Sequence, residues 1–142
     1  MVSECVSSSL GMEDGRIADE DITVSSSFDP KSVGAAMSRI RQDIRGGAWC
    51  PASAISNESK EWLEVNLKSN YRITGIETMG RFAGGHGQEF VGRYRLEYWH
   101  QSWHSYPEVL DGNTNTYLAH KQDLRIPIVT SKVRILPYSV SA

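Results

Sequence analysis

Cysteine is scarce in this sequence, and the two residues of this type do not establish a disulfide. The 142 residues contain only Cys5 and Cys50. Three states are compatible with this count: the cysteines pair with each other, both stay as thiols, or their partners lie beyond the C-terminus. The cysteine count alone does not distinguish among them.

The sequence also has no large excess of positive or negative charge, and it has no long apolar run. The chain has 15 Lys and Arg against 17 Asp and Glu, a formal net charge of −2, and a pI near 6.1. This balance lacks the electrostatic footprint of a nucleic-acid-binding domain. No run approaches the roughly 18 apolar residues of a membrane span, so no transmembrane segment is expected here. The opening residues lack the basic and apolar regions of a signal peptide, so we expect no targeting signal in this sequence.

What is present is the composition of one folded domain that is rich in β-strands. Hydrophobic residues make up 39% and charged residues 23% of the chain, as in ordinary globular domains, and the length fits one domain. Strand patterns occur at residues 22–24, 63–67, 71–77, 93–99, 117–119, 126–129 and 133–136. Short strands separated by turns predict an all-β fold, an antiparallel sandwich or jelly roll.

One short helix is expected between the first two of these strands. Val33, Ala36, Met37 and Ile40 follow helical spacing, and Ser32 precedes them as the predicted N-cap.

A glycine-rich connection at residues 80–90 carries the most distinctive chemistry. It joins two predicted strands and holds Arg81, His86 and Glu89 among its glycines. Such loops present binding groups on a rigid scaffold, and glycine lets the backbone approach a ligand closely. A chain that returns on itself would bring Arg81 and Glu89 within ion-pair distance. That pair either pins the loop or borders a recognition groove with the planar donors of arginine, and the two roles are compatible.

The same connection does not have the pattern of a catalytic centre. His86 lies three residues before Glu89, but a metal site would need a second cluster of ligands, and the other histidines have no ligand spacing. No helix follows the glycines to present its N-terminus to a phosphate. No serine or cysteine lies in a nucleophile motif. We therefore expect no metal, no cofactor and no enzymatic activity.

Two further positions are candidates for contacts outside the domain. Phe28 is followed by Asp29 and Pro30, so it is either an exposed anchor for a partner or an aromatic ring folded back over the end of the sandwich. Asn57 begins the only glycosylation sequon, which has meaning only in an extracellular protein.

Several stretches of the chain together resemble one family. The stretches that match it in order are residues 10–17, 19–23, 47–51, 80–90, 109–115 and 127–129. The chain resembles a discoidin (coagulation factor V/VIII type C) domain over residues 5–138, with residues 1–4 and 139–142 flanking it. Its Gly-Gly-His-Gly-x-Glu-Phe loop and its Leu-Asp-Gly-Asn turn are most similar to the discoidin domain receptors, which are collagen-binding receptor tyrosine kinases.

The resemblance implies both a fold and a site. The implied fold is an eight-stranded, galactose-binding-domain-like jelly-roll barrel whose loops at one end bind the ligand. In the discoidin domain receptors that ligand is triple-helical collagen, and the domain is extracellular. By position, the tryptophan of the family's binding trench aligns with Phe28, and a nearby threonine aligns with Ser32. The arginine and glutamate of the trench align with Arg81 and Glu89.

The sequence departs from the family pattern at three places. The phenylalanine at position 28 lacks the indole N–H of tryptophan, and Gly46 stands where an acidic residue is expected. The chain also stops before the last strand of the family, which holds the cysteine partners of Cys5 and Cys50. We therefore expect a domain without its last strand, and losing both bridges would cost roughly 2–5 kcal/mol apiece.

The leading hypothesis is an extracellular domain that binds collagen and not nucleic acid. The resemblance implies that the domain belongs to a longer receptor chain, which forms a homodimer on the cell surface. Any tyrosine kinase would lie in another part of that chain. The alternative is a discoidin-type module that binds carbohydrate or anionic phospholipid head groups. A third hypothesis, an enzyme that uses His86 and Glu89, requires a metal or a nucleophile.

Overall fold

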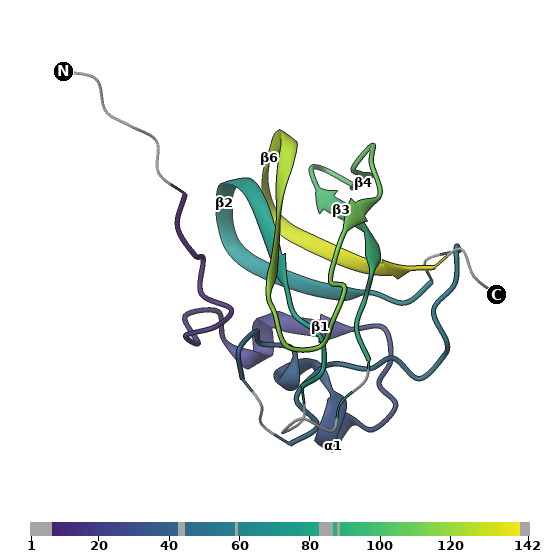
Figure 1. Cartoon of the computed structure of the whole chain (residues 1–142). Coiled ribbons are helices and arrows are strands. Elements are labelled where there is room, and N and C mark those ends of the chain that lie inside the picture. Colours follow the sequence, from purple (N-terminus) through teal and green to yellow (C-terminus); the bar gives the residue numbers. More distant parts are fainter. Residues whose placement is uncertain (1–6, 43–44, 59, 83–86, 88, 140–142) are drawn as a thin grey trace.

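Six strands form one antiparallel sheet in the part of the chain that the structure describes. The structure is a computed structural model, which describes residues 7–42, 45–58, 60–82, 87 and 89–139. The strands are β1 (Ile22–Val24), β2 (Leu63–Thr78), β3 (Arg93–Trp99), β4 (Trp103–Ser105), β5 (Leu110–Asp111) and β6 (His120–Tyr138). They follow the order β1-β2-β6-β3-β4, with β5 paired to β3, and every pairing is antiparallel (Figure 1). The predicted all-β fold is confirmed.

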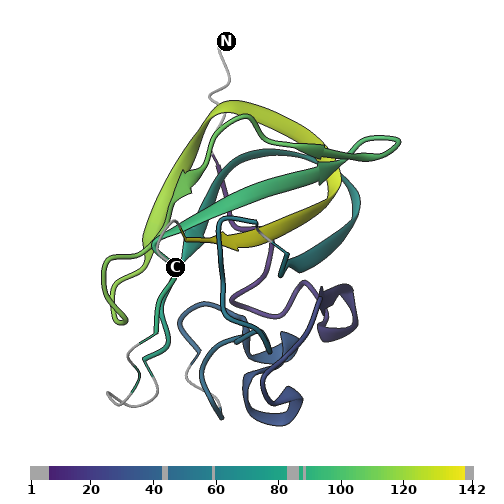
Figure 2. The same ribbon diagram turned by 90° about the vertical axis from the view of Figure 1, so that its right-hand side faces the viewer.

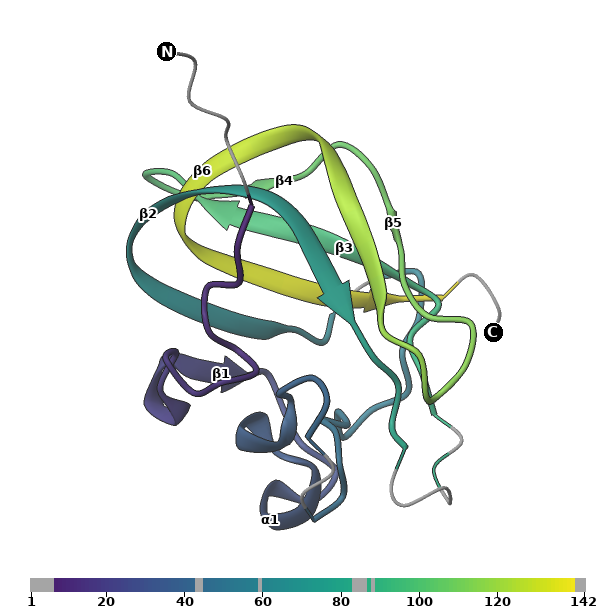
Figure 3. The same cartoon turned by 60° about the vertical axis from the view of Figure 1, so that its left-hand side comes forward.

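The two long strands, β2 and β6, run through the middle of the sheet and bend around its interior (Figure 3). Their pairing is interrupted between Asn66 and Tyr71, where Lys68 adopts a left-handed φ of 65°. This bulge turns the chain while the backbone stays extended on both sides. The strands predicted at 63–67 and 71–77 are therefore one strand, and those predicted at 126–129 and 133–136 are another.

The apolar side chains pack into two neighbouring clusters. The larger cluster lies inside the curved sheet and contains Ile73, Tyr94, Leu96, Tyr106, Leu110, Leu124 and Ile128. The smaller cluster packs the N-terminal segment and β1 against the first half of β2 through Ile17, Ile22, Leu63 and Val65. Leu67 and Val133 contact both clusters, so the apolar interior is continuous.

A row of charges crosses three strands on the opposite face of the sheet. Arg134 of β6 pairs in register with Glu64 of β2 and with Glu97 of β3. Its guanidinium lies 2.9 Å from the Glu64 carboxylate and 4.4 and 4.0 Å from the ring centres of Trp62 and Trp103. These contacts stabilise the register of β2, β6 and β3.

The predicted helix is shorter than its apolar spacing indicates, and the prediction of Ser32 as its N-cap is wrong. The helix α1 (Pro30–Val33) begins after Asp29, whose side chain accepts a hydrogen bond from the first turn. Proline at the first helical position favours this start. Extended backbone at Gly34 ends the helix, and the chain continues in the 3₁₀ helix η2 (Ala35–Met37).

The strand predicted at residues 117–119 is also wrong, because this stretch is a loop that precedes β6. The side-chain oxygen of Asn115 accepts the backbone N–H groups of Tyr117 and Leu118 at 3.1 and 2.8 Å. A side chain that takes the N–H donors of the next residues holds a turn in place of a strand.

Three connections gather at one end of the sheet (Figure 2). Among the described residues, the first connection comprises 25–42 and 45–50, which include α1 and η2, the second comprises 79–82, 87 and 89–92, and the third comprises 112–119. We call this the loop end. No helix in the described ranges is long and apolar enough to cross a membrane.

Candidate binding site

Arg81 and Glu89 lie opposite each other where the second connection leaves the sheet and returns. The backbone N–H of Arg81 donates to the carbonyl of Glu89 at 2.8 Å. The Nη1 atom of Arg81 donates to both carboxylate oxygens of Glu89, at 3.1 and 3.3 Å. The expected ion pair is thus formed, with the carboxylate largely exposed and the guanidinium half-buried.

Glycine at position 87 allows this close return of the chain. The N–H of Gly87 donates to the carbonyl of Phe82 at 2.9 Å. A Cβ atom at Gly87 would lie only 1.8 Å from the carbonyl oxygen of Arg81. Any side chain here would therefore push the two arms of the connection apart and separate Arg81 from Glu89.

Arg81 is anchored on the first connection through Gly46. Its Nε atom donates to the Gly46 carbonyl at 2.6 Å, and the N–H of Gly46 donates to the Ser32 carbonyl at 2.8 Å. A Cβ at Gly46 would lie 2.4 Å from that Ser32 oxygen. The acidic residue expected at this position does not fit here without movement of α1, so glycine keeps Arg81 and α1 in contact.

Phe28 and Ser32 also belong to the first connection. Phe28 is 78% exposed, and its N–H donates to the Cys50 carbonyl at 2.8 Å. The hypothesis of an exposed aromatic therefore agrees with the structure, and a ring folded back over the end of the sandwich does not. The Ser32 hydroxyl donates to the carboxylate of Asp29 at 3.0 Å, so it is held at the start of α1.

Cys50 lies among these groups, and its N–H donates to the Val33 carbonyl at 3.0 Å. Burial raises the pKa of the Cys50 thiol, the charge of Glu89 raises it further, and the charge of Arg81 lowers it. The thiol is therefore protonated at neutral pH and is a weak nucleophile. Within the described ranges Cys50 has no disulfide, and Cys5 lies outside them.

Asn113 joins the second and third connections at the loop end. Its side-chain amide donates to the carbonyls of Thr78 and Leu118 at 2.8 and 3.0 Å, and its backbone N–H donates to the Val91 carbonyl at 2.8 Å. The side chain is almost completely buried, so it fixes both loops from beneath. Its place in the Leu-Asp-Gly-Asn turn is the only sequence signal for this role.

Hydrogen bonds thus connect the segments that carry the four predicted site residues. Comparison with known proteins identifies the family of the chain. Residues 21–141 match the F5/8 type C domain. The chain belongs to this family. Discoidin domain-containing receptor A of Caenorhabditis elegans is 39% identical over 97% of the chain. Epithelial discoidin domain-containing receptor 1 of Homo sapiens is 37% identical over 90% of the chain. The chain spans only 19% and 15% of these two relatives.

Solved structures share the fold of this F5/8 type C domain. Discoidin II of Dictyostelium discoideum superposes with a TM-score of 0.65 at 17% identity, covering 83% of this chain and 49% of that one. A family 32 CBM of Clostridium perfringens NanJ, solved in complex with galactose, has a TM-score of 0.60 at 15% identity. That match covers 89% of this chain and 88% of the other. The predicted discoidin-type, galactose-binding-domain-like fold is confirmed.

An F5/8 type C domain is a non-catalytic binding module. The chain is therefore a ligand-binding discoidin domain and not an enzyme, as the sequence predicts. Within the ranges that the structure describes, no group of three or more His, Cys, Asp and Glu side chains is arranged to hold a metal ion. His86 lies outside those ranges.

The predicted glycosylation position does not belong to this neighbourhood of contacts. Asn57 is exposed in a turn, and its sequon ends at Ser59, which lies outside the described ranges. Glycosylation at Asn57 stays a prediction.

Proposed function

We propose that this F5/8 type C domain binds triple-helical collagen at its loop end, through Phe28, Ser32, Arg81 and Glu89. The observation that carries the proposal is the ion pair of Arg81 and Glu89, anchored on Gly46, at the same loop end as the exposed ring of Phe28. The similarity to the discoidin domain receptors supports the same proposal.

The chemistry of these groups suits a collagen rod. Collagen has glycine at every third position, so apolar and charged side chains project outward at a regular spacing. The exposed ring of Phe28 offers contact area of the kind that anchors interfaces. Arg81 and Glu89 offer a donor and an acceptor side by side, for side chains of either charge. Because Gly46 already holds Arg81, binding would cost little additional side-chain entropy.

The proposal extends to the context of the domain. We propose that it is an extracellular part of a longer receptor, that it forms dimers there, and that any tyrosine kinase lies in another part of that chain. The first relatives support this assignment by name, since two are a discoidin domain-containing receptor and a receptor tyrosine kinase.

The test is solid-phase binding of the 142-residue domain to triple-helical collagen and to the same collagen after heat denaturation. We expect binding to the native form only. Arg81→Ala and Glu89→Ala should each weaken it by about tenfold or more, because each removes a charge-assisted contact. Phe28→Ala should weaken it comparably by loss of buried area.

The matched control uses a second exposed ion pair, Arg125 with Glu108, which lies outside the loop end. Arg125→Ala should bind collagen like the unmodified domain. Equal losses in Arg125→Ala and Arg81→Ala, or no binding by a domain with a cooperative thermal unfolding transition, would remove collagen as the ligand.

A second candidate is an anionic phospholipid surface, which one observation favours. Phe82, Phe90, Tyr117 and Leu118 are all exposed on the second and third connections, and apolar loop tips of this kind insert among lipid head groups. Sedimentation with phosphatidylserine-containing vesicles distinguishes the two candidates. If lipid is the ligand, Tyr117→Ser and Leu118→Ser should abolish sedimentation, and Arg81→Ala should not impair it.

A further inference from the structure

The hairpin between β3 and β4 brings two histidines together at the end of the molecule opposite α1 (Figure 1). In an extended strand, residues 100 and 104 would be about 13 Å apart. Here the N–H of His100 donates to the Ser102 carbonyl at 2.9 Å, and Gln101 has a left-handed φ of 61°. This tight turn brings the ring centres of His100 and His104 to 6.2 Å from each other. The sequence predicts no metal ligands here, because only the folded hairpin creates this proximity.

The ring of His104 is held in a definite orientation. Its Nε2 atom lies 2.9 Å from the carbonyl oxygen of His100 and 3.4 Å from the hydroxyl of Ser102. Because a carbonyl only accepts hydrogen bonds, Nε2 carries the hydrogen, and the lone pair of the neutral ring lies on Nδ1. The ring also stacks on Tyr98, with the ring centres 5.6 Å apart. Histidines that bind metal ions usually donate their other N–H to a carboxylate or a backbone carbonyl, so His104 already has the hydrogen bond of a ligand.

The separation of the two rings also fits one shared metal ion. Two imidazoles on the same ion have their ring centres roughly 4.5–6.5 Å apart, because each bound nitrogen lies about 2.0–2.1 Å from the ion. The observed 6.2 Å lies within this range. Both side chains are exposed, so a small rotation of His100 brings a ring nitrogen toward Nδ1 of His104 without disturbing the core.

Two cations near the hairpin lie on its other face. Lys132 and Arg134 lie 5.6 and 4.0 Å from the ring centres of the tryptophans that end β3 and begin β4. Successive side chains of a strand point to opposite faces, so His104 and Tyr98 lie on the face away from these tryptophans. On that face Tyr98 packs against the larger core cluster. The two cations therefore do not oppose a metal ion beside the imidazoles.

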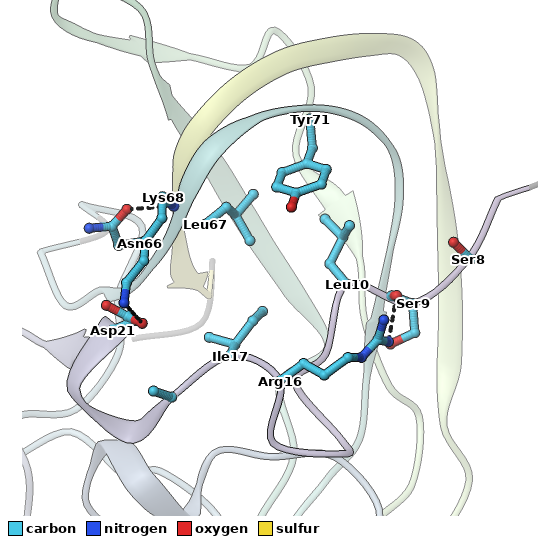
Figure 4. A pocket seen from close by; sticks show the side chains of 11 residues that line it. Ser8, Ser9, Leu10, Arg16, Ile17, Asp21, Asn66, Leu67, Lys68 and Tyr71 are labelled. Carbon is cyan, nitrogen blue, oxygen red and sulfur yellow. Dashed lines mark hydrogen bonds and ion pairs between the residues drawn. The ribbon is translucent and has the colours of Figure 1, made fainter.

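The pocket between the N-terminal segment and the bend of β2 lacks this chemistry (Figure 4). Its volume is about 400 Å³, and none of the described residues that line it is a histidine or a cysteine. Its one carboxylate, that of Asp21, lies 3.2 Å from the Lys68 ammonium. A metal ion is therefore expected at the hairpin and not in this pocket.

We propose that His100 and His104 form a binding site for one divalent transition-metal ion, such as Cu²⁺, Ni²⁺ or Zn²⁺. The two protein ligands would be Nδ1 of His104 and one ring nitrogen of His100, and water would complete the coordination. Imidazole suits these ions, whereas Ca²⁺ and Mg²⁺ prefer oxygen ligands. The site shares no residue with the collagen proposal, so either proposal can fail without the other.

The test is a titration of the ¹⁵N-labelled 142-residue chain with Zn²⁺, followed through the ring nitrogens of the histidines by NMR. Before Zn²⁺ is added, His104 should show the tautomer with its hydrogen on Nε2. We expect saturable shifts of the His100 and His104 rings, and no shift of the ring of His120, which is exposed at the start of β6. The same titration with Ca²⁺ should leave all three rings unchanged.

Removing one ligand tests whether the two rings act together. His100→Gln should raise the Zn²⁺ concentration that half-saturates His104 by about tenfold or more, since even the loss of a supporting hydrogen bond costs that much at metal sites. His120→Gln is the matched control and should leave that concentration unchanged.

Three results would overturn the proposal. The first is the absence of any shift of the His100 and His104 rings at about 1 mM Zn²⁺, which corresponds to a binding free energy weaker than about −4 kcal/mol. The second is equal half-saturation of His104 in His100→Gln and the unmodified chain, which would mean that one imidazole binds alone. The third is an equal shift of the His120 ring, which would mean that Zn²⁺ binds any exposed histidine.

Discussion

At the scale of single residues, Gly46 decides how the candidate binding site is assembled. It accepts the Nε–H of Arg81 and donates to the carbonyl of Ser32, so it joins two connections that are far apart in the sequence. A Cβ at this position would also lie 2.5 Å from a methyl carbon of Val33. The lack of a side chain is therefore what allows α1 to approach Arg81.

We predict that Gly46→Ala destabilises the domain by about 1–3 kcal/mol, the usual cost of forcing extra atoms into a packed region. The measurement is the free energy of unfolding in urea. Gly92→Ala is the matched control, because a Cβ at Gly92 would lie 3.8 Å from its nearest neighbour, the carbonyl oxygen of Asn113. Its effect should stay below about 0.5 kcal/mol. Equal effects of the two substitutions would contradict the role of Gly46.

Sequence reasoning found the charged pair but not its support. Arg81 and Glu89 flank a glycine-rich return of the chain, so their approach is a local consequence of the sequence. Gly46 contacts Ser32 and Arg81, which are 14 and 35 positions away, and Asn113 contacts Val91 and Thr78, which are 22 and 35 positions away. No periodicity in a single sequence records such contacts.

At the scale of elements, Arg41 fastens the first connection to the sheet. Its guanidinium donates to both carboxylate oxygens of Glu77 in β2, at 3.0 Å each, and to Glu13 of the N-terminal segment at 3.1 Å. The hydrogen bonds from Arg41 hold the pKa of Glu77 below its ordinary value of 4.5. One side chain thus links three segments.

This link predicts a pH dependence of stability. A carboxyl group whose pKa is lowered by folding stabilises the native state above its unfolded pKa, and that contribution is lost as the pH falls through the folded pKa. Glu77→Gln should therefore lower the free energy of unfolding at pH 7, by less than about 1 kcal/mol because the pair is partly exposed. The difference from the unmodified domain should shrink as the pH falls below 4.5, the ordinary pKa of a glutamate.

The measurement is chemical unfolding of both proteins from pH 3 to pH 7, repeated in an Arg41→Gln background. In that background Glu77→Gln should have little effect at any pH. A difference that grows as the pH falls, or that persists without Arg41, would show that Glu77 acts through another group.

At the scale of the whole molecule, the sheet and the loop end differ in how much structure supports them. β6 pairs with β2 on one side and with β3 on the other, and it spans 19 residues. The helix α1 has four residues and is held by hydrogen bonds from the loops around it. The proposed binding groups are thus carried by loops, and the sheet supplies a rigid support.

We predict that backbone amides of β6 and β3 exchange with deuterium slowest and those of α1 and η2 fastest. The reason is that opening a central strand breaks two ladders and exposes the core, whereas opening the loop end breaks single hydrogen bonds. Hydrogen exchange followed by mass spectrometry measures this. Protection of α1 equal to that of β6 would mean that the loop end and the sheet unfold as one unit.

The sequence by itself determined that the chain is a β-rich domain with a glycine-rich loop bearing Arg81 and Glu89. These features follow from alternation within strands and from a short return of the chain, which are local properties. Only the tertiary structure decided that β2 and β6 run continuously through their bends, and that Gly46 joins Arg81 to the segment of Ser32. It also formed the pocket between the N-terminal segment and β2. The physical reason is that these features depend on contacts between segments far apart in the chain, which form only when the core brings those segments together.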